Sequence, residues 1–179
     1  MKKDMEKILF SEEQIEEIVT RMAAEIDADY EGKDLLLIGV LKGSILFMSD
    51  LMKKIQNKCR IDFMVVSSYA DGTVSTGRVN ILKDVSMSVE GKNLLIIEDI
   101  IDSGNTLHFL DQYLTAKGAA SVKIATLFDK PDRRRMDVPV QYVGAVIPDE
   151  FIVGYGLDYA EYYRNLPYVG VLKPEIYSE

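Results

Sequence analysis

The sequence contains a single cysteine, Cys59, and no tryptophan in its 179 residues. One cysteine forms neither an intrachain disulfide nor a cysteine metal cluster, so we expect a buried thiol in a reducing cytoplasm. The N-terminal residues lead into no apolar stretch long enough for a signal peptide or a membrane helix. These absences favour a cytoplasmic protein over a secreted or membrane-embedded one.

An excess of positive charge is also missing. The chain has 21 lysine and arginine residues against 29 acidic residues, which gives a formal net charge of −8. This balance argues against broad binding to nucleic acid or to an anionic membrane, so we expect neither partner, although a local basic patch is compatible with it. The length and the hydrophobic content of 47% are typical of one globular domain with a sizeable core.

Helical and strand-like segments alternate along the chain. Residues 11–14 form a capping-box pattern and apolar residues at helical spacing follow, which predicts a helix over 11–29. Further helices are expected at 44–56 and about 106–117, and strands at 35–40, 61–68, 94–97 and 122–128. In the helix over 44–56 the expected inward side chains are Ile45, Phe47, Met48, Leu51, Met52 and Ile55. This order of elements, with apolar strands, predicts an α/β fold in which helices flank a mostly parallel twisted sheet.

The tail of the chain differs from the rest in composition. From Gln141 onward it is rich in tyrosine and contains short strand-like pieces, which we expect to form a small hood on the sheet. No linker or low-complexity segment interrupts the chain. We therefore expect a single domain over residues 1–179, with a core of about 11–140 and a hood formed mainly by about 141–179.

Residues 94–107, "LLIIEDIIDSGNTL", end an apolar strand in acids and small polar residues. In open parallel sheets, ligands bind beyond the carboxyl ends of the strands, where Glu98 and Asp99 lie. The backbone N–H groups of residues 103–106, at the start of a helix, can converge on a phosphate. Glu98 and Asp99 suit ribose hydroxyls or Mg²⁺, which leaves Asp102 as a proton acceptor. A helix cap would explain Asp102 or Ser103 alone, but not three acids, a glycine and two hydroxyls within nine residues.

Other phosphate-binding patterns fit less well. Gly91-Lys92 lacks the upstream glycine of a Walker loop and leads into a strand. Gly154-Tyr155-Gly156 has Tyr159 in the place of the third glycine of the dinucleotide fingerprint. A receiver domain would carry its paired acids after the first strand, whereas here they come past mid-chain. We discard all three interpretations.

Five segments together resemble the type I phosphoribosyltransferases. "IIEDIIDSGNTL" (96–107) is similar to the phosphoribosyl-diphosphate motif of that family, and "LKGS" (41–44) to its pyrophosphate loop. "SSYADGTVSTG" (67–77) looks like its mobile catalytic lid and "LFDKP" (127–131) like its purine-reading lysine segment. "IPDEFIVGYGLDYAEYYRNLPYVGVL" (147–172) resembles the base-stacking hood of the hypoxanthine(-guanine) phosphoribosyltransferases. The motifs occur in the family's order over almost the whole chain.

The resemblance implies a phosphoribosyl-diphosphate site. Glu98 and Asp99 would bind the ribose hydroxyls, with Mg²⁺ as the cofactor nearby, and Asp158 would be a second magnesium ligand. The 5′-phosphate would be held by Asp102, Ser103, Gly104, Asn105 and Thr106. Pyrophosphate would contact Lys42 and Gly43, through a non-proline cis peptide between Leu41 and Lys42, and Arg164 would add positive charge. Ser68 and Tyr69 would belong to a lid that closes over the site.

The resemblance also implies how the base is bound and what is made. Asp102 would be the general base near N7 as N9 of the purine attacks C1′. Lys130 is only a donor, which suits O6 of a 6-oxopurine, and Phe151 would stack on the ring. The base site would also include the backbone of Ile152 and Asp158. The implied activity is Mg²⁺-dependent synthesis of IMP, and of GMP, from the free base and phosphoribosyl diphosphate in purine salvage, by a homodimer or homotetramer.

Several alternatives stay open on the sequence alone. The segment 70–80 fits a plain hairpin loop as well as a lid. Arg133-Arg134-Arg135 is more typical of a solvated loop or subunit contact than of a phosphate site. His108 is more typical of a surface or packing position than of catalysis. A regulator of the same fold that binds nucleic acid is the competing class of protein, but the acidic charge and the base-reading residues disfavour it.

Overall fold

The computed structural model describes residues 1–68 and 79–178. Tyr69 and most of the segment expected to form a lid lie outside the described residues. The main sheet has six strands in the order β4-β3-β2-β5-β6-β7. These are β2 (Leu35–Leu41), β3 (Cys59–Ser68), β4 (Val79–Lys83), β5 (Asn93–Ile101), β6 (Ser121–Asp129) and β7 (Tyr142–Val146). All neighbours are parallel except β3 and β4, which confirms the predicted mostly parallel α/β sheet.

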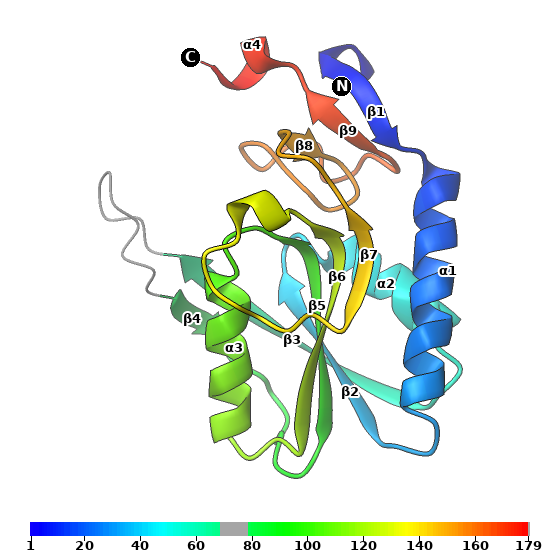
Figure 1. The fold of residues 1–179 in the computed structure, drawn as a ribbon, viewed down its shortest axis with the longest axis vertical. Coiled ribbons are helices and arrows are strands. Elements are labelled where there is room, and N and C mark those ends of the chain that lie inside the picture. Colours follow the sequence, from blue (N-terminus) through cyan, green and yellow to red (C-terminus); the bar gives the residue numbers. More distant parts are fainter. Residues whose placement is uncertain (69–78, 179) are drawn as a thin grey trace.

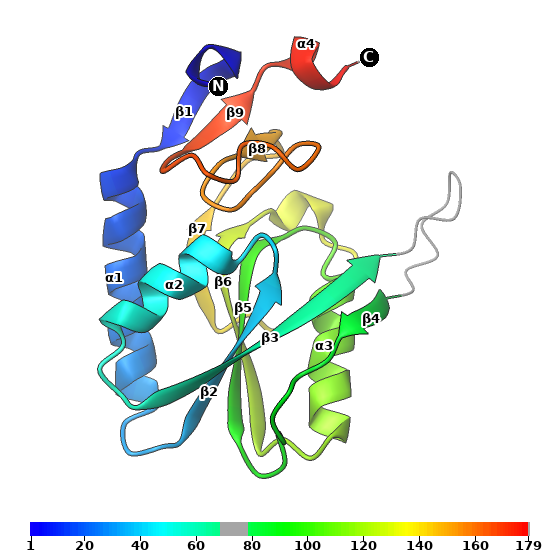
Figure 2. The same cartoon turned by 180° about the vertical axis from the view of Figure 1, so that it is seen from behind.

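Helices cover both faces of this sheet (Figures 1 and 2). Helices α1 (Glu12–Asp29) and α2 (Ile45–Lys54) pack on one face, and α3 (Asn105–Ala116) packs on the other. Successive residues of β5 alternate between the two cores: Leu95 and Ile97 face α1 and α2, whereas Leu94 and Ile96 face α3. Because helices cover both faces of the sheet, a central strand such as β5 has an unbroken apolar run in its sequence.

The local sequence accounts for the helix boundaries. Ser11 caps α1 by accepting a hydrogen bond from Gln14 N at 3.3 Å, while Gln14 Oε1 accepts one from Ser11 N at 2.9 Å, so the expected capping box is present. One inward residue was predicted wrongly. Ile45, the first residue of α2, is 41% exposed because the buried face of this short helix follows Phe47, Met48 and Leu51.

A second, three-stranded sheet has the order β1-β9-β8. It consists of β1 (Met5–Phe10), β9 (Val169–Leu172) and β8 (Ile152–Val153), flanked by η1 (Lys2–Asp4) and α4 (Pro174–Tyr177). The small sheet lies over the end of the main sheet where β5 and β6 finish, and both termini lie beside it (Figure 1). We call this sheet with residues 147–178 the hood.

The hood therefore differs from the expected one in two respects. The N-terminal strand β1 belongs to it, because β1 pairs with β9 in antiparallel register, with Met5 opposite Leu172. Strand β7, which the sequence placed in the hood, pairs instead in parallel with β6 and forms an edge of the main sheet. The tail thus contributes one strand to the main sheet before the hood begins.

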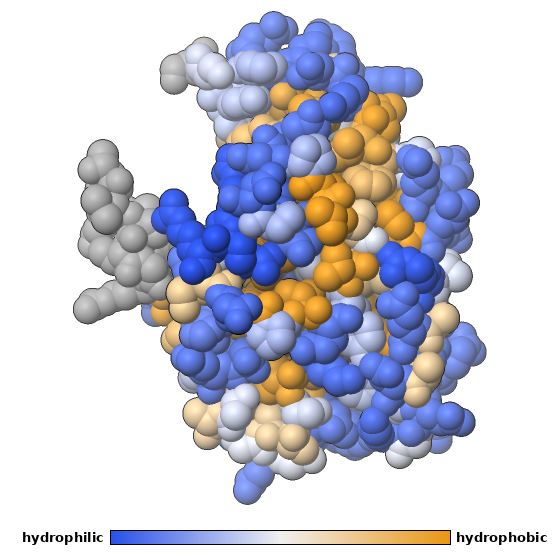
Figure 3. All heavy atoms as spheres, in the orientation of Figure 1, coloured by the Kyte–Doolittle hydropathy of each residue, from blue (hydrophilic) through white to orange (hydrophobic). Residues whose placement is uncertain are grey.

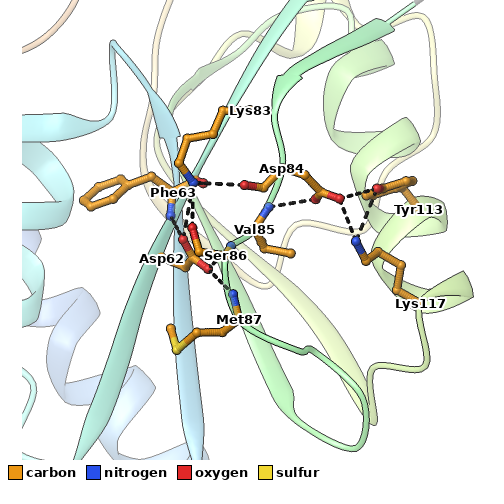
Figure 4. A network of polar contacts seen from close by, with 9 residues as sticks. All are labelled: Asp62, Phe63, Lys83, Asp84, Val85, Ser86, Met87, Tyr113 and Lys117. Carbon is orange, nitrogen blue, oxygen red and sulfur yellow. Dashed lines mark hydrogen bonds and ion pairs between the residues drawn. The ribbon is translucent and has the colours of Figure 1, made fainter.

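A polar network ties the chain after β4 to helix α3 (Figure 4). The carboxylate of Asp84 accepts hydrogen bonds from Tyr113 Oη and from Lys117 Nζ, each at 2.6 Å. Lys83 Nζ donates to the carbonyl of Phe63 at 2.7 Å and to that of Asp84 at 2.9 Å. These bonds fix the stem of the β3–β4 hairpin against α3. None of the described helices is long and apolar enough to cross a membrane.

Candidate active site

The carboxyl end of β5 carries two adjacent buried acids. Glu98 and Asp99 are each 9% exposed, and their own backbone supplies the donors: Asp99 N to Glu98 Oε1 at 3.3 Å and Ile100 N to Asp99 Oδ1 at 2.9 Å. Burial raises the pKa of Glu98 well above its usual value, and the negative charge of Asp99 raises it further. Burial also raises the pKa of Asp99. Such a pair is stabilised by a cation or by hydroxyl donors placed against it.

The turn over residues 102–106 opens α3 directly after β5. Gly104 is the N-cap residue in a left-handed conformation with φ 82°, and a Cβ there would lie 2.9 Å from the carbonyl oxygen of Met136. A larger residue would therefore not fit. Among the described residues, Asp102 Oδ1 is buried without a hydrogen-bond partner. The turn lines a cavity of about 160 Å³, bounded by Glu98, Ile100, Ile101, Asp102, Ser103, Gly104, Thr106 and Leu107.

The loop after β2 reaches the same place. The peptide between Leu41 and Lys42 is cis, as expected. A Cβ on Gly43 would lie 1.8 Å from Asp99 Oδ2, so only a glycine lets this loop pass against the acid. Ser44, buried at the start of α2, donates its hydroxyl to the carbonyl of Val40 at 2.7 Å and so closes the loop on its own strand.

The hood adds positive charge to this side of the site. Arg164 donates from Nη1 to the carbonyl of Gly156 at 2.7 Å and pairs through Nη2 with Asp158 Oδ1 at 2.8 Å. Its charge also counteracts the rise in the pKa of Asp99 that burial causes. Lys42 Nζ lies 2.7 Å from Glu161 Oε2, and Glu161 Oε1 lies 3.4 Å from Arg164 Nη2. One glutamate therefore links the two cations.

A buried lysine and an aromatic stack lie between the sheet and the hood. Lys130, 6% exposed, donates from its backbone N to the carbonyl of Ile101 at 3.0 Å and from Nζ to that of Glu150 at 2.7 Å. Phe151 is 38% exposed, and its ring stacks on Tyr177 with 4.6 Å between centroids and 19° between planes. Ile152 is buried and opposes Val171 in the hood sheet.

The structure thus gathers most of the predicted site residues at one end of the sheet. Two acids come from β5 and the turn follows it, the 41–43 loop follows β2, Lys130 follows β6, and Arg164 belongs to the hood. Asp158 is not grouped with Glu98 and Asp99: its oxygens are taken by Arg164 and, at 2.9 Å, by Glu161 N. Over residues 1–68 and 79–178, no three acidic, histidine or cysteine side chains are grouped to hold a metal by themselves. Ser68 ends β3, and Tyr69 lies outside the described residues.

Three residues of this region were not singled out as site residues from the sequence: Glu161, Tyr177 and Arg134. Glu161 and Tyr177 gave no signal beyond their residue type. The sequence groups Arg134 with Arg133 and Arg135 in a solvated loop or subunit contact, whereas in the structure it donates from Nε to the carbonyl of Asp102 at 3.1 Å. Only the folded structure shows that the contacts of Arg134 differ from those of Arg133 and Arg135.

A larger cavity, of about 560 Å³, lies elsewhere, between α1, α2 and the hood. Its polar lining includes Asp50, which accepts a hydrogen bond from Tyr155 Oη at 2.6 Å. None of the predicted site residues lines it. The candidate catalytic and binding residues therefore lie at the carboxyl ends of the strands and not in the larger cavity.

Comparison with known proteins agrees with this geometry. Residues 7–160 match the family model of the phosphoribosyl transferase domain. The chain is 53% identical over 178 residues to the hypoxanthine-guanine phosphoribosyltransferase of Staphylococcus aureus, covering 99% of each chain. A crystal structure of a hypoxanthine phosphoribosyltransferase from the same organism superposes with a TM-score of 0.97 at 52% identity, covering 100% of this chain and 97% of that one. The chain is also 55% identical to the bifunctional protein TilS/HprT of Listeria innocua, but it spans only 28% of the length of that relative.

Proposed function

The chain belongs to the phosphoribosyl transferase domain family, and on this premise we propose that it is a purine-salvage enzyme. It transfers the 5-phosphoribosyl group of phosphoribosyl diphosphate to N9 of hypoxanthine, and of guanine, and releases IMP or GMP and pyrophosphate. The observation that carries the proposal is the turn at the start of α3, where Asp102 Oδ1 is buried and has no hydrogen-bond partner among the described residues, close along the chain to the buried acids Glu98 and Asp99. The relatives' names support the choice of base.

The turn and the two acids bind different parts of the phosphoribosyl group. The N–H groups of Ser103, Gly104, Asn105 and Thr106 bind the 5′-phosphate, which the positive end of the α3 dipole favours. Glu98 and Asp99 accept hydrogen bonds from the ribose hydroxyls, which compensates their burial. The sugar is therefore held at both ends, with C1′ directed toward the base.

The base is held and activated by residues from three segments. Lys130 donates to O6 of a 6-oxopurine, and because it is buried, this interaction is desolvated and discriminates against a 6-amino group. Phe151 stacks on the ring, and Ile152 and Asp158 complete the base site. Asp102 is the catalytic residue: its free Oδ1 takes the proton at N7 as N9 attacks C1′.

The departing pyrophosphate is stabilised by the cationic side of the site. Lys42 and the backbone of the 41–43 loop bind it, and Arg164 adds charge from the hood. Glu98 and Asp99 would hold a Mg²⁺ ion, because a cation stabilises two adjacent buried carboxylates. Mg²⁺ bound there supplies positive charge against the leaving group. Asp158 would be the ligand of a second ion, for which its carboxylate would have to exchange its ion pair with Arg164.

The remaining parts of the proposal concern the whole molecule. The chain acts as one phosphoribosyltransferase domain in a cytoplasmic homodimer or homotetramer, without nucleic-acid or membrane partners. Ser68 and Tyr69 contact phosphoribosyl diphosphate from the segment after β3. These statements are supported by the family and by the charge balance of the sequence.

Steady-state kinetics test the proposed activity. The initial rate of nucleotide formation is measured with hypoxanthine, guanine, xanthine and adenine, each at saturating phosphoribosyl diphosphate, with Mg²⁺ and with chelator in excess. We expect Mg²⁺-dependent turnover of hypoxanthine and guanine and none of adenine. Efficient use of adenine would refute the role of Lys130, and no turnover of any base would refute the enzyme assignment.

A further inference from the structure

The segment that follows β6 forms a support behind the 102–106 turn. Three successive carbonyl groups, those of Ile101, Asp102 and Ser103, accept hydrogen bonds from it. The donors are, in order, Lys130 N at 3.0 Å, Arg134 Nε at 3.1 Å, and Arg135 N and Met136 N at 2.9 Å each. Every carbonyl at the start of the turn is thus directed toward residues 130–136.

This orientation also sets the direction of the N–H groups. A trans peptide is planar, and its N–H points opposite to its carbonyl. Holding the carbonyls of residues 101–103 toward the supporting segment therefore turns the N–H groups of Asp102, Ser103 and Gly104 away from it. The hydrogen bonds from residues 130–136 thus hold these N–H groups in fixed directions. A phosphate can then bind to them with little loss of conformational entropy.

One of the four donors is a side chain, and it comes from the arginine run. Arg134 is 22% exposed and its Nη2 pairs with Asp129 Oδ1 at the end of β6. By contrast Arg133 is 54% exposed and pairs with Asp149, and Arg135 is exposed. Strongly hydrophilic surface covers η2 (Pro131–Arg133) and the chain after it (Figure 3). Three identical residues in a row thus differ in role, because only Arg134 turns inward.

The shape of the guanidinium suits this position. Its nitrogens lie in a rigid planar fork, so it bonds Asp129 on one element and the Asp102 carbonyl on another at the same time. The stem also lies close to the turn, since Arg134 Cδ is 3.0 Å from the place where a Cβ on Gly104 would be. A lysine has one charged nitrogen on a flexible stem and cannot satisfy both acceptors in this geometry.

We propose that Arg134 is a positioning residue that holds the 102–106 turn in its phosphate-binding shape. It acts through the peptide between Asp102 and Ser103, which carries one of the phosphate donors and adjoins the catalytic carboxylate. The inference rests on the proposed function. Because Arg134 contacts the turn and not Lys130, its loss affects phosphoribosyl diphosphate more than the base.

Arg134→Gln and Arg134→Lys test the proposal, with Arg60→Gln as the matched control. Arg60 also forms an Arg–Asp pair, with Asp34 at 3.6 Å, but it does so at the opposite end of the strands. For Arg134→Gln we expect the KM for phosphoribosyl diphosphate to rise roughly 10- to 100-fold and kcat to fall, while the KM for hypoxanthine changes by less than about threefold. Arg134→Lys should recover only part of the loss, and Arg60→Gln should match the wild type.

A second measurement separates positioning from loss of stability and from failure of the proposed function. Ribose 5-phosphate is titrated into each folded variant at a temperature well below its unfolding midpoint, and its Kd is determined. We expect weaker binding in both Arg134 variants, and a similar weakening in Asp129→Asn, which frees the guanidinium. Wild type without transferase activity would refute the function, whereas an Arg134→Gln variant with the wild-type Kd for ribose 5-phosphate would overturn the role of Arg134.

Discussion

Glu161 bridges the two cations that we assign to pyrophosphate, with Oε2 2.7 Å from Lys42 Nζ and Oε1 3.4 Å from Arg164 Nη2. The hydrogen bond from Lys42 lowers the pKa of Glu161, so the glutamate is charged at neutral pH. A carboxylate in this position offers the same kind of acceptor as a phosphate oxygen. We therefore expect Glu161 to compete with pyrophosphate for Lys42 and Arg164.

Glu161→Gln is accordingly expected to strengthen pyrophosphate binding. Exposed ion pairs contribute little, so the KM for pyrophosphate in the reverse reaction should fall by only about two- to fivefold. The advantage should shrink as salt is raised, because exposed charges are screened. Glu25→Gln, which removes the exposed partner of Arg21 on α1, is the control and should change nothing. A rise in the KM would mean that Glu161 orients the cations instead of competing for them.

The stack of Phe151 on Tyr177 makes a prediction about the base. Tyr177 covers one face of the Phe151 ring and fixes its plane. If the purine stacks on Phe151, Tyr177→Ala should raise the KM for hypoxanthine about 2- to 12-fold, which corresponds to the interaction free energy of one aromatic pair. The KM for phosphoribosyl diphosphate should stay unchanged. Tyr177→Phe keeps the ring and should match the wild type. A lower KM in Tyr177→Ala would show that Tyr177 occupies the face that the base needs.

Much of the fold could be predicted because its signals are local. Residues 94–97 of β5 are apolar throughout because both faces of the strand are covered, and Ser11 and Gln14 mark the start of α1 within four residues. Strand β1 could not be predicted, because its partner β9 lies more than 150 residues away. Its outward residues also give it no clear alternation of apolar and polar positions.

The site divides in the same way. Its central part follows from a strand end, three acids and a turn that are contiguous in the sequence. The pairing of Asp158 with Arg164, and the difference between Arg134 and its neighbours, depend on segments that meet only in the folded chain. Residue type alone therefore cannot distinguish a ligand from a support.

Asp62 gives a prediction for stability against pH (Figure 4). It is buried, and its carboxylate accepts hydrogen bonds from the N–H groups of Phe63, Ser86 and Met87 at 2.6–3.0 Å. Burial alone would raise its pKa, but these bonds and Lys83 lower it below the usual value. A carboxyl whose pKa is lowered on folding stabilises the native state above its unfolded pKa and loses that contribution as the pH falls through the folded value.

Asp62→Asn should therefore lower the free energy of unfolding at pH 7 by about 1–3 kcal/mol, because an amide replaces a charged acceptor facing three donors. The difference from wild type should narrow as the pH falls from about 4, the pKa of the unfolded carboxyl, through the lower pKa of the folded one, because the unfolded chain takes up the proton first. Urea unfolding at a series of pH values measures both effects. Asp34→Asn, at an exposed position, is the control and should show no such convergence. A constant difference at all pH values would show that Asp62 acts by packing and not by charge.

The roles of the three acids at the end of β5 can be separated by isosteric substitution. Asp102→Asn keeps the size of the side chain but removes the basic carboxylate, whose Oδ1 has no hydrogen-bond partner within residues 1–68 and 79–178. General-base catalysis contributes roughly 10²- to 10⁴-fold, so kcat should fall within that range. The Kd for phosphoribosyl diphosphate should change by less than about tenfold, since backbone N–H groups hold the phosphate. Single-turnover kinetics and equilibrium titration give the two quantities separately.

The double variant Glu98→Gln, Asp99→Asn is the comparison for Asp102→Asn, because it should change affinity where Asp102→Asn changes rate. It removes two charged acceptors from the ribose and from Mg²⁺, so binding of phosphoribosyl diphosphate should weaken more than in Asp102→Asn. The two variants should thus show opposite patterns, one in rate and the other in affinity. If Asp102→Asn lost affinity and kept its rate, Asp102 would serve only to shape the turn. The proton at N7 would then have to be taken by another group, because we assign Glu98 and Asp99 to the sugar and not to the base.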